Sequence, residues 1–162
     1  MDVFTFIDSA CALRPYFENC ARIGLAHRGG DATACFDALR VPGLLAEDAM
    51  RRATGGVNTH KGAIFSLGIA CASLGMGYGA PLDVHETLMR CGAMTGAQMH
   101  KELEAAKADR RILASDLPKG GHWRRSREAA GGFASVREIA AETQAGLFGL
   151  SLNDGRFARW SR

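Results

Sequence analysis

One stretch of the sequence limits the possible folds more than any other: residues 62–80 contain no charged side chain. A run of about nineteen uncharged residues approaches the length that crosses a bilayer, but five glycines and two serines interrupt it, and the helical pattern ends near Gly75. The apolar residues form two stripes at helical spacing, Ile64, Leu67, Cys71 and Leu74 on one side and Phe65, Ile69, Ala72 and Met76 on the other. Because a helix that is apolar on all sides is usually buried, this run predicts the central helix of a core.

The rest of the chain also shows helical spacing of apolar residues, and no stretch alternates as a strand does. Pro15 either bends the first expected helix or opens a second one, and Leu45 is expected on the inner face of the next. The expected helices span residues 3–25, 44–53, about 82–113 and about 135–147. A chain of 162 residues can build one sizeable core but is too short to suggest two. The sequence therefore predicts an all-α, single compact multi-helix domain over residues 1–162.

The composition argues against several classes of function. A formal net charge of +3 is too small to indicate nucleic-acid binding by itself. Asp2 and Asp8 stand where a secretory signal would need positive charge. The five cysteines are widely spaced and form no Cys-x-x-Cys pair, so we expect reduced core residues and not disulfides or zinc ligands. These features predict a cytoplasmic protein with no nucleic-acid or membrane partner.

A polar segment directly precedes the uncharged run, and residues 55–62 read Gly-Gly-Val-Asn-Thr-His-Lys-Gly. The glycines allow a tight turn, and Asn58 or Thr59 can cap the following helix. His60 and Lys61 would then project from the first helical turn, where free N–H groups and the helix dipole favour an anion such as phosphate. The alternative is an ordinary capped helix with a solvated lysine and a locally hydrogen-bonded histidine.

Residues 56–68, Gly-Val-Asn-Thr-His-Lys-Gly-Ala-Ile-Phe-Ser-Leu-Gly, resemble the signature of the triphosphoribosyl-dephospho-CoA synthase family, which serves citrate lyase and malonate decarboxylase. Residues 4–17 resemble the first core helix of that family, and residues 46–54 its approach to the signature. Residues 128–133, Glu-Ala-Ala-Gly-Gly-Phe, are similar to a second family motif, although the arginine is displaced by one position to Arg127 and the following proline is absent.

Two parts of the family pattern have no counterpart in this sequence. Members normally begin with Pro-Lys-Pro-Gly-Leu-Val and His-x-Asp-Met segments, and they continue to Asp-x-Asn and Arg-Gly-Gly segments. The resemblance therefore corresponds to the central part of a full-length member. We expect either a truncated product or a chain that is completed by another subunit. That subunit would be a second copy of this chain, in a homo-oligomer, or a different, complementing protein.

The resemblance implies an enzyme that joins ATP to 3'-dephospho-CoA and releases adenine. The product would be 2'-(5-triphosphoribosyl)-3'-dephospho-CoA, the precursor of the acyl-carrier prosthetic group of malonate decarboxylase or citrate lyase. Such a glycosyl transfer passes through an oxocarbenium-like transition state, and ATP as substrate implies Mg²⁺ as its companion. The alternative is a catalytically incomplete fragment that acts as a nucleotide-binding or subunit-interaction domain.

The family resemblance also assigns roles to individual residues. Glu128 is the predicted catalytic carboxylate, as general base or metal ligand, with helix capping or ion pairing as its alternative. His60 is the second predicted catalytic residue and would orient the ribose or the base. The predicted nucleotide- and phosphate-binding residues are Asn58, Thr59, Lys61, Gly62 and Arg127.

Overall fold

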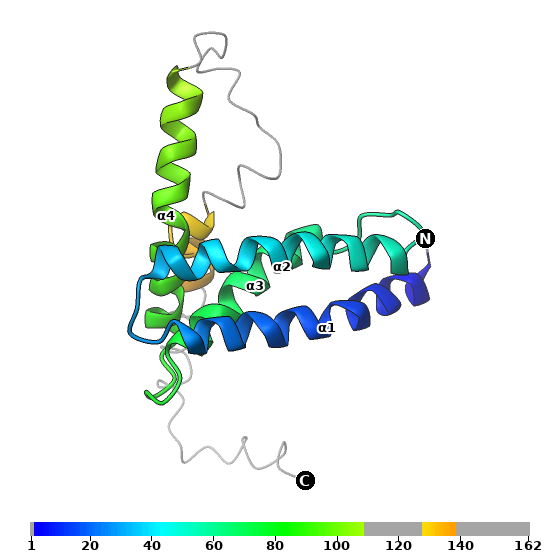
Figure 1. Cartoon of the computed structure of the whole chain (residues 1–162), viewed down its shortest axis with the longest axis horizontal. Coiled ribbons are helices and arrows are strands. Elements are labelled where there is room, and N and C mark those ends of the chain that lie inside the picture. Colours follow the sequence, from blue (N-terminus) through cyan, green and yellow to red (C-terminus); the bar gives the residue numbers. More distant parts are fainter. Residues whose placement is uncertain (1, 109–127, 139–162) are drawn as a thin grey trace.

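The computed structural model describes residues 2–108 and 128–138, and these form an all-α structure without strands (Figure 1). The long helices are α1 (Val3–Ala26), α2 (Ala32–Ala53), α3 (Lys61–Met76) and α4 (Val84–Ala108). Helices α1, α2 and α3 lie side by side, whereas α4 crosses them steeply at one end and extends beyond them. The predicted all-α class is confirmed. That residues 1–162 form a single domain stays a prediction, since part of the predicted helix over 135–147 lies outside the described residues.

The first two helices differ from the sequence-based expectation in one respect each. Pro15 lies inside a continuous α1 and does not open a second helix. Helix α2 begins at Ala32 instead of residue 44, because Asp31 caps it by accepting a hydrogen bond from the Thr33 N–H. The predicted inner position of Leu45 is wrong, since this side chain is 63% exposed. The buried face of α2 consists of smaller or softer side chains, Cys35, Leu39, Ala46 and Met50.

Helix α3 contacts α1, α2 and α4, which confirms its predicted central position. One buried cluster surrounds its N-terminal half and contains Leu13, Ala46, Met50 and Ile64. A larger cluster surrounds its C-terminal half and contains Cys20, Cys35, Leu39, Ile69, Ala72, Leu88, Cys91, Met94, Ala129 and Phe133. Burial is not complete on all sides, because Leu67 and Leu74 are 52% and 46% exposed. None of the described helices combines the length and apolar character needed to cross a membrane.

Glycines let α1 and α3 approach to backbone contact. A Cβ atom added to Gly24 of α1 would overlap the carbonyl group of Ala72, and one added to Gly75 of α3 would overlap the carbonyl oxygen of Ala21. Both obstacles are backbone atoms, which cannot move aside as a flexible side chain can. The distance between the two helices therefore depends on the missing side chains at these positions.

All five cysteines are free, as the sequence predicts. Burial raises the pKa of the Cys20 thiol to about 11 and also raises the pKa of Cys35, Cys71 and Cys91. These thiols therefore stay protonated near neutral pH and are poor nucleophiles and metal ligands. The expected core position is wrong only for Cys11, which is exposed.

Candidate functional site

The turn between α2 and α3 has the backbone conformation that its glycines suggest. Gly55 and Gly56 adopt φ angles of 63° and 97°, which favour glycine over residues with a Cβ atom. The Gly56 N–H donates to the Arg51 carbonyl oxygen at 2.8 Å, a bond characteristic of a Schellman ending. The hydroxyl of Thr54 lies 2.6 Å from the Val57 carbonyl oxygen and ties the turn to the end of α2. The approach of the chain to α3 is thus fixed by local bonds.

The first turn of α3 presents free backbone donors. His60 occupies the N-cap position of α3 and its side chain makes no capping bond, so neither Asn58 nor Thr59 is the cap residue. Asn58 Oδ1 nevertheless accepts a hydrogen bond from the N–H of Lys61, the first helical residue, at 3.2 Å. The N–H groups of Gly62 and Ala63 have no acceptor among the described residues. Unpaired donors at the positive end of a helix dipole attract anions, so this turn has the donor pattern of a phosphate site.

The side chain of His60 is held by two hydroxyl groups and an aromatic ring. Its Nδ1 atom lies 2.9 Å from Ser9 Oγ and 3.0 Å from Thr59 Oγ1, and the two hydroxyl oxygens are 2.6 Å apart. The ring of Phe6 packs on the imidazole with centroids 4.2 Å apart. The His60 N–H points to Met50 Sδ at 3.1 Å. His60 is therefore anchored to both α1 and α2.

Sequence reasoning did not identify Ser9 as part of this site, although its position in the sequence carries a signal. Ser9 is fully buried and shares the inner face of α1 with Leu13, four residues further along. A polar side chain at such a core position needs a hydrogen-bonding partner. The sequence indicates that a partner exists, but only the fold identifies it as the loop before α3.

Lys61 is neither simply solvated nor free. Its Nζ atom lies 3.1 Å from Glu47 Oε2, and the Arg51 guanidinium lies 3.2 Å from the same oxygen. The Glu47–Arg51 spacing indicates an ordinary pair along α2, so the sequence gives no sign of a contact with Lys61. Glu47 is thus a further residue that sequence reasoning missed as part of this site.

Glu128 lies elsewhere in the molecule. Residues 128–138, yellow to orange in Figure 1, lie beside α4, whereas residues 54–60 lie near the N-terminus, at the opposite end of α3. The 16 residues of α3 correspond to roughly 24 Å of helix. The Glu128 carboxylate accepts hydrogen bonds from the N–H and the hydroxyl of Ser135, which agrees with its alternative role as a helix cap. The structure does not bring it together with His60 and Lys61, and Arg127 lies outside the described residues.

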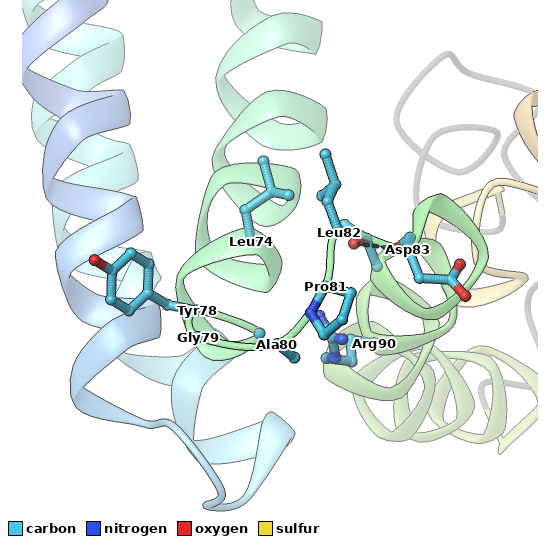
Figure 2. A pocket seen from close by; sticks show the side chains of 10 residues that line it. Leu74, Tyr78, Gly79, Ala80, Pro81, Leu82, Asp83 and Arg90 are labelled. Carbon is cyan, nitrogen blue, oxygen red and sulfur yellow. Dashed lines mark hydrogen bonds between the residues drawn. The ribbon is translucent and has the colours of Figure 1, made fainter.

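A pocket of about 270 Å³ lies at the same end of α3 as the turn to α4 (Figure 2). Figure 2 shows Tyr78 on the side of the pocket where α1 is drawn. Arg90 donates to the Ser73 carbonyl oxygen and to the Glu86 carboxylate, so its guanidinium stabilises the turn. The lining residues are Leu74, Gly77, Tyr78, Gly79, Ala80, Pro81, Leu82, Asp83, Thr87 and Arg90. This pocket lies away from the polar cluster at the start of α3.

The described residues define an all-α protein whose central helix begins with a polar, anion-compatible turn. Comparison with protein families makes the assignment specific, because the model of the family described as CitG, ATP:dephospho-CoA triphosphoribosyl transferase, matches residues 1–151. The chain belongs to this family, which confirms the resemblance found in the sequence.

Curated relatives support the same assignment. A protein of Lactiplantibacillus plantarum named as a probable 2-(5''-triphosphoribosyl)-3'-dephosphocoenzyme-A synthase is 54% identical over 69 residues, which are 43% of this chain and 25% of the relative. Protein CitXG of Leuconostoc mesenteroides subsp. cremoris is 56% identical over 69 residues, which are 43% of this chain and 15% of the relative. A protein of Vibrio cholerae with the same name as the first relative is 49% identical over 75 residues, which are 46% of this chain and 24% of the relative.

The match spans a quarter or less of the length of each of these relatives. Their names therefore describe longer proteins, of which this chain matches one part. No solved structure matches the chain.

Proposed function

We propose that this chain carries the nucleotide-handling part of a triphosphoribosyl-dephospho-CoA synthase. The reaction joins ATP to 3'-dephospho-CoA, releases adenine, and supplies the prosthetic-group precursor of malonate decarboxylase or citrate lyase. The observation that carries this proposal is the start of α3, where Lys61 and the free N–H groups of Gly62 and Ala63 lie beside His60. Membership of the transferase family supports the same reaction.

The proposed chemistry is a glycosyl transfer at C1' of the ATP ribose. The bond from C1' to adenine breaks, a bond from C1' to the 2'-hydroxyl oxygen of 3'-dephospho-CoA forms, and the triphosphate stays on the ribose. The hydroxyl loses a proton and the departing adenine gains one, so a side chain that can both accept and donate a proton assists both steps. His60 is the described side chain at the start of α3 with that property.

The phosphate-binding role falls on Lys61 and the first turn of α3. A lysine ammonium has three donors, so Lys61 can keep its bond to Glu47 and still bind a phosphate oxygen. Asn58 supports this turn by accepting a hydrogen bond from the Lys61 N–H, and Thr59 does so through the hydroxyl cluster at His60. Arg127 is still proposed to add positive charge and Glu128 to act as a carboxylate, but Glu128 would do so away from His60 and Lys61, and its Ser135 contacts support the alternative capping role more directly.

Mg²⁺ accompanies ATP in this proposal. Among residues 2–108 and 128–138, no three His, Cys, Asp or Glu side chains gather as a metal site. A nucleotide-bound magnesium ion needs only one or two carboxylates, because phosphates and water complete its coordination. Glu47 already pairs with Lys61 and Arg51, so the triphosphate and water would supply the ligands of the ion, which would neutralise part of the phosphate charge.

The test follows adenine release and ATP binding in one set of proteins. We expect the parent protein, incubated with ATP, Mg²⁺ and 3'-dephospho-CoA, to release adenine that is detected by chromatography. Lys61→Ala should weaken ATP binding by about tenfold to a hundredfold, because a charged hydrogen bond is lost, and the loss should shrink at high salt. Stability should change little, because Glu47 keeps its pair with Arg51.

Lys101→Ala is the matched control, since Lys101 is an exposed lysine on α4. It should bind ATP as the parent does. An unchanged ATP affinity in Lys61→Ala would remove the phosphate role. ATP binding without adenine release in the parent would replace the enzyme by a catalytically incomplete nucleotide-binding domain.

The second candidate function is a subunit-interaction domain, and the exposed face of α3 favours it. Leu67 and Leu74 lie on this face of α3, which has no charged residue after Lys61, and Leu82 is exposed nearby. Figure 2 shows Leu74 and Leu82 close together at the pocket. Exposed apolar patches on a helix often mark contacts with another chain.

We expect the parent protein to self-associate through this face, with a molar mass by light scattering that rises with concentration. Leu67→Glu should shift the protein to the monomer, because a carboxylate in an apolar contact must be desolvated. Leu45→Glu is the control, because Leu45 is exposed on α2. A parent that is monomeric at all concentrations, or an equal effect of both variants, would contradict the assignment of this face.

A further inference from the structure

The hydroxyl of Ser9 makes hydrogen bonds that are unusual for a helical serine. Serine in a helix often bonds to the carbonyl oxygen one turn earlier, but the Ser9 hydroxyl bonds only to Thr59 and His60 among the described residues. Ser9 has 0% relative exposure. A buried hydroxyl of α1 is thus used entirely to hold the loop that leads into α3.

Two hydroxyl groups at Nδ1 suit a histidine that changes its protonation state. A hydroxyl can donate to a neutral Nδ1 and can equally accept from a protonated one. Ser9 and Thr59 can therefore satisfy the imidazole in both states by rotating their O–H bonds. A carboxylate in the same place would favour the charged imidazolium alone.

The same contacts determine which nitrogen of His60 is free. Nδ1 is occupied by the two hydroxyl groups, and no described residue bonds to Nε2. Phe6 packs against the ring and limits its rotation. Nε2 is therefore the nitrogen that is left for a ligand at the start of α3, next to Lys61.

We propose that Ser9 is a positioning residue that holds His60 through Nδ1 and leaves Nε2 to exchange protons with the substrate. This inference rests on the proposed function, in which His60 assists glycosyl transfer. Ser9 itself does not touch the substrate, because a side chain with 0% exposure cannot reach the ribose. Its effect is exerted through the orientation and the proton affinity of the imidazole.

The test compares Ser9→Ala with Ser73→Ala. Ser73 is also a fully buried serine, and its hydroxyl donates to the Thr87 carbonyl oxygen near the other end of α3. Both variants lose one buried hydrogen bond, but only Ser9→Ala touches His60. The ring ¹⁵N shifts of His60 are recorded by NMR across a pH titration, with His60→Gln used to assign the signals.

We expect Ser9→Ala to change the tautomer balance of His60, seen as a change in the ¹⁵N shifts of Nδ1 and Nε2. The kcat for adenine release should fall by about tenfold to a hundredfold, with its pH profile displaced and the KM for ATP much less affected. Ser73→Ala should leave the His60 signals and the pH profile as in the parent. Ser9→Thr, which keeps the hydroxyl, should retain the parental His60 signals.

Unchanged His60 ring shifts across the pH titration of folded Ser9→Ala would overturn the proposal, and so would an equal change in Ser73→Ala. If Ser9→Ala does not fold, Ser9→Cys carries the same measurement, because a thiol is similar in shape but a weak donor. A parent that releases no adenine would contradict the proposed enzyme. The ring shifts would still decide whether Ser9 controls His60.

Discussion

Gly24→Ala is expected to lower the free energy of unfolding by about 3 kcal/mol, an effect at the upper end of overpacking costs. The added Cβ would overlap the backbone carbonyl of Ala72, so α1 and α3 must move apart. The intrinsic preference of a helix for alanine over glycine acts in the opposite direction by only about 1 kcal/mol. The overlap with the backbone therefore outweighs the helix preference, and the net change in the free energy of unfolding is a loss of stability.

Gly96→Ala is the matched control for this prediction. Gly96 lies inside α4, and a Cβ at this position would meet nothing within 4 Å. This variant should gain up to about 1 kcal/mol, because alanine lowers the entropy of the unfolded chain and favours the helix. Urea unfolding followed by circular dichroism measures the free energy of unfolding of both variants and of the parent. If Gly24→Ala were as stable as Gly96→Ala, the close contact between α1 and α3 would be wrong.

His60→Gln should reduce adenine release by about 10²- to 10⁴-fold, the range for loss of a general acid or base. Glutamine can form hydrogen bonds but cannot exchange a proton near pH 7. ATP affinity should change by only a few-fold, because Lys61 and the N–H groups of α3 are retained. Initial rates by chromatography and ATP titrations measure the two effects separately.

His85→Gln controls for the loss of a histidine as such, since His85 is exposed on α4. It should release adenine at the parental rate. The stability of His60→Gln must be measured in parallel, because the imidazole packs on Phe6. A stable His60→Gln protein with the parental rate would leave His60 with a structural role only.

The sequence by itself determined the helical class, the central position of α3 and the local structure before it. The uncharged run confines α3 to the core, Gly55 and Gly56 form the turn, and Asn58 accepts a hydrogen bond from the first N–H of the helix. These features depend on residues a few positions apart or on the pattern along one helix. The start of α2 escaped the same reasoning, because its inner face uses small residues such as Cys35 and Ala46 while Leu45 is exposed.

Only the tertiary structure decided which groups meet at the start of α3. It brought Ser9 of α1 to His60 and Glu47 of α2 to Lys61, and it placed the segment of residues 128–138 beside α4. Capping and turn formation follow from local sequence because the partners are neighbours in the chain. Contacts between helices depend on how α1 and α2 pack against α3, and that packing is set by buried surfaces and glycine contacts distributed over the whole fold.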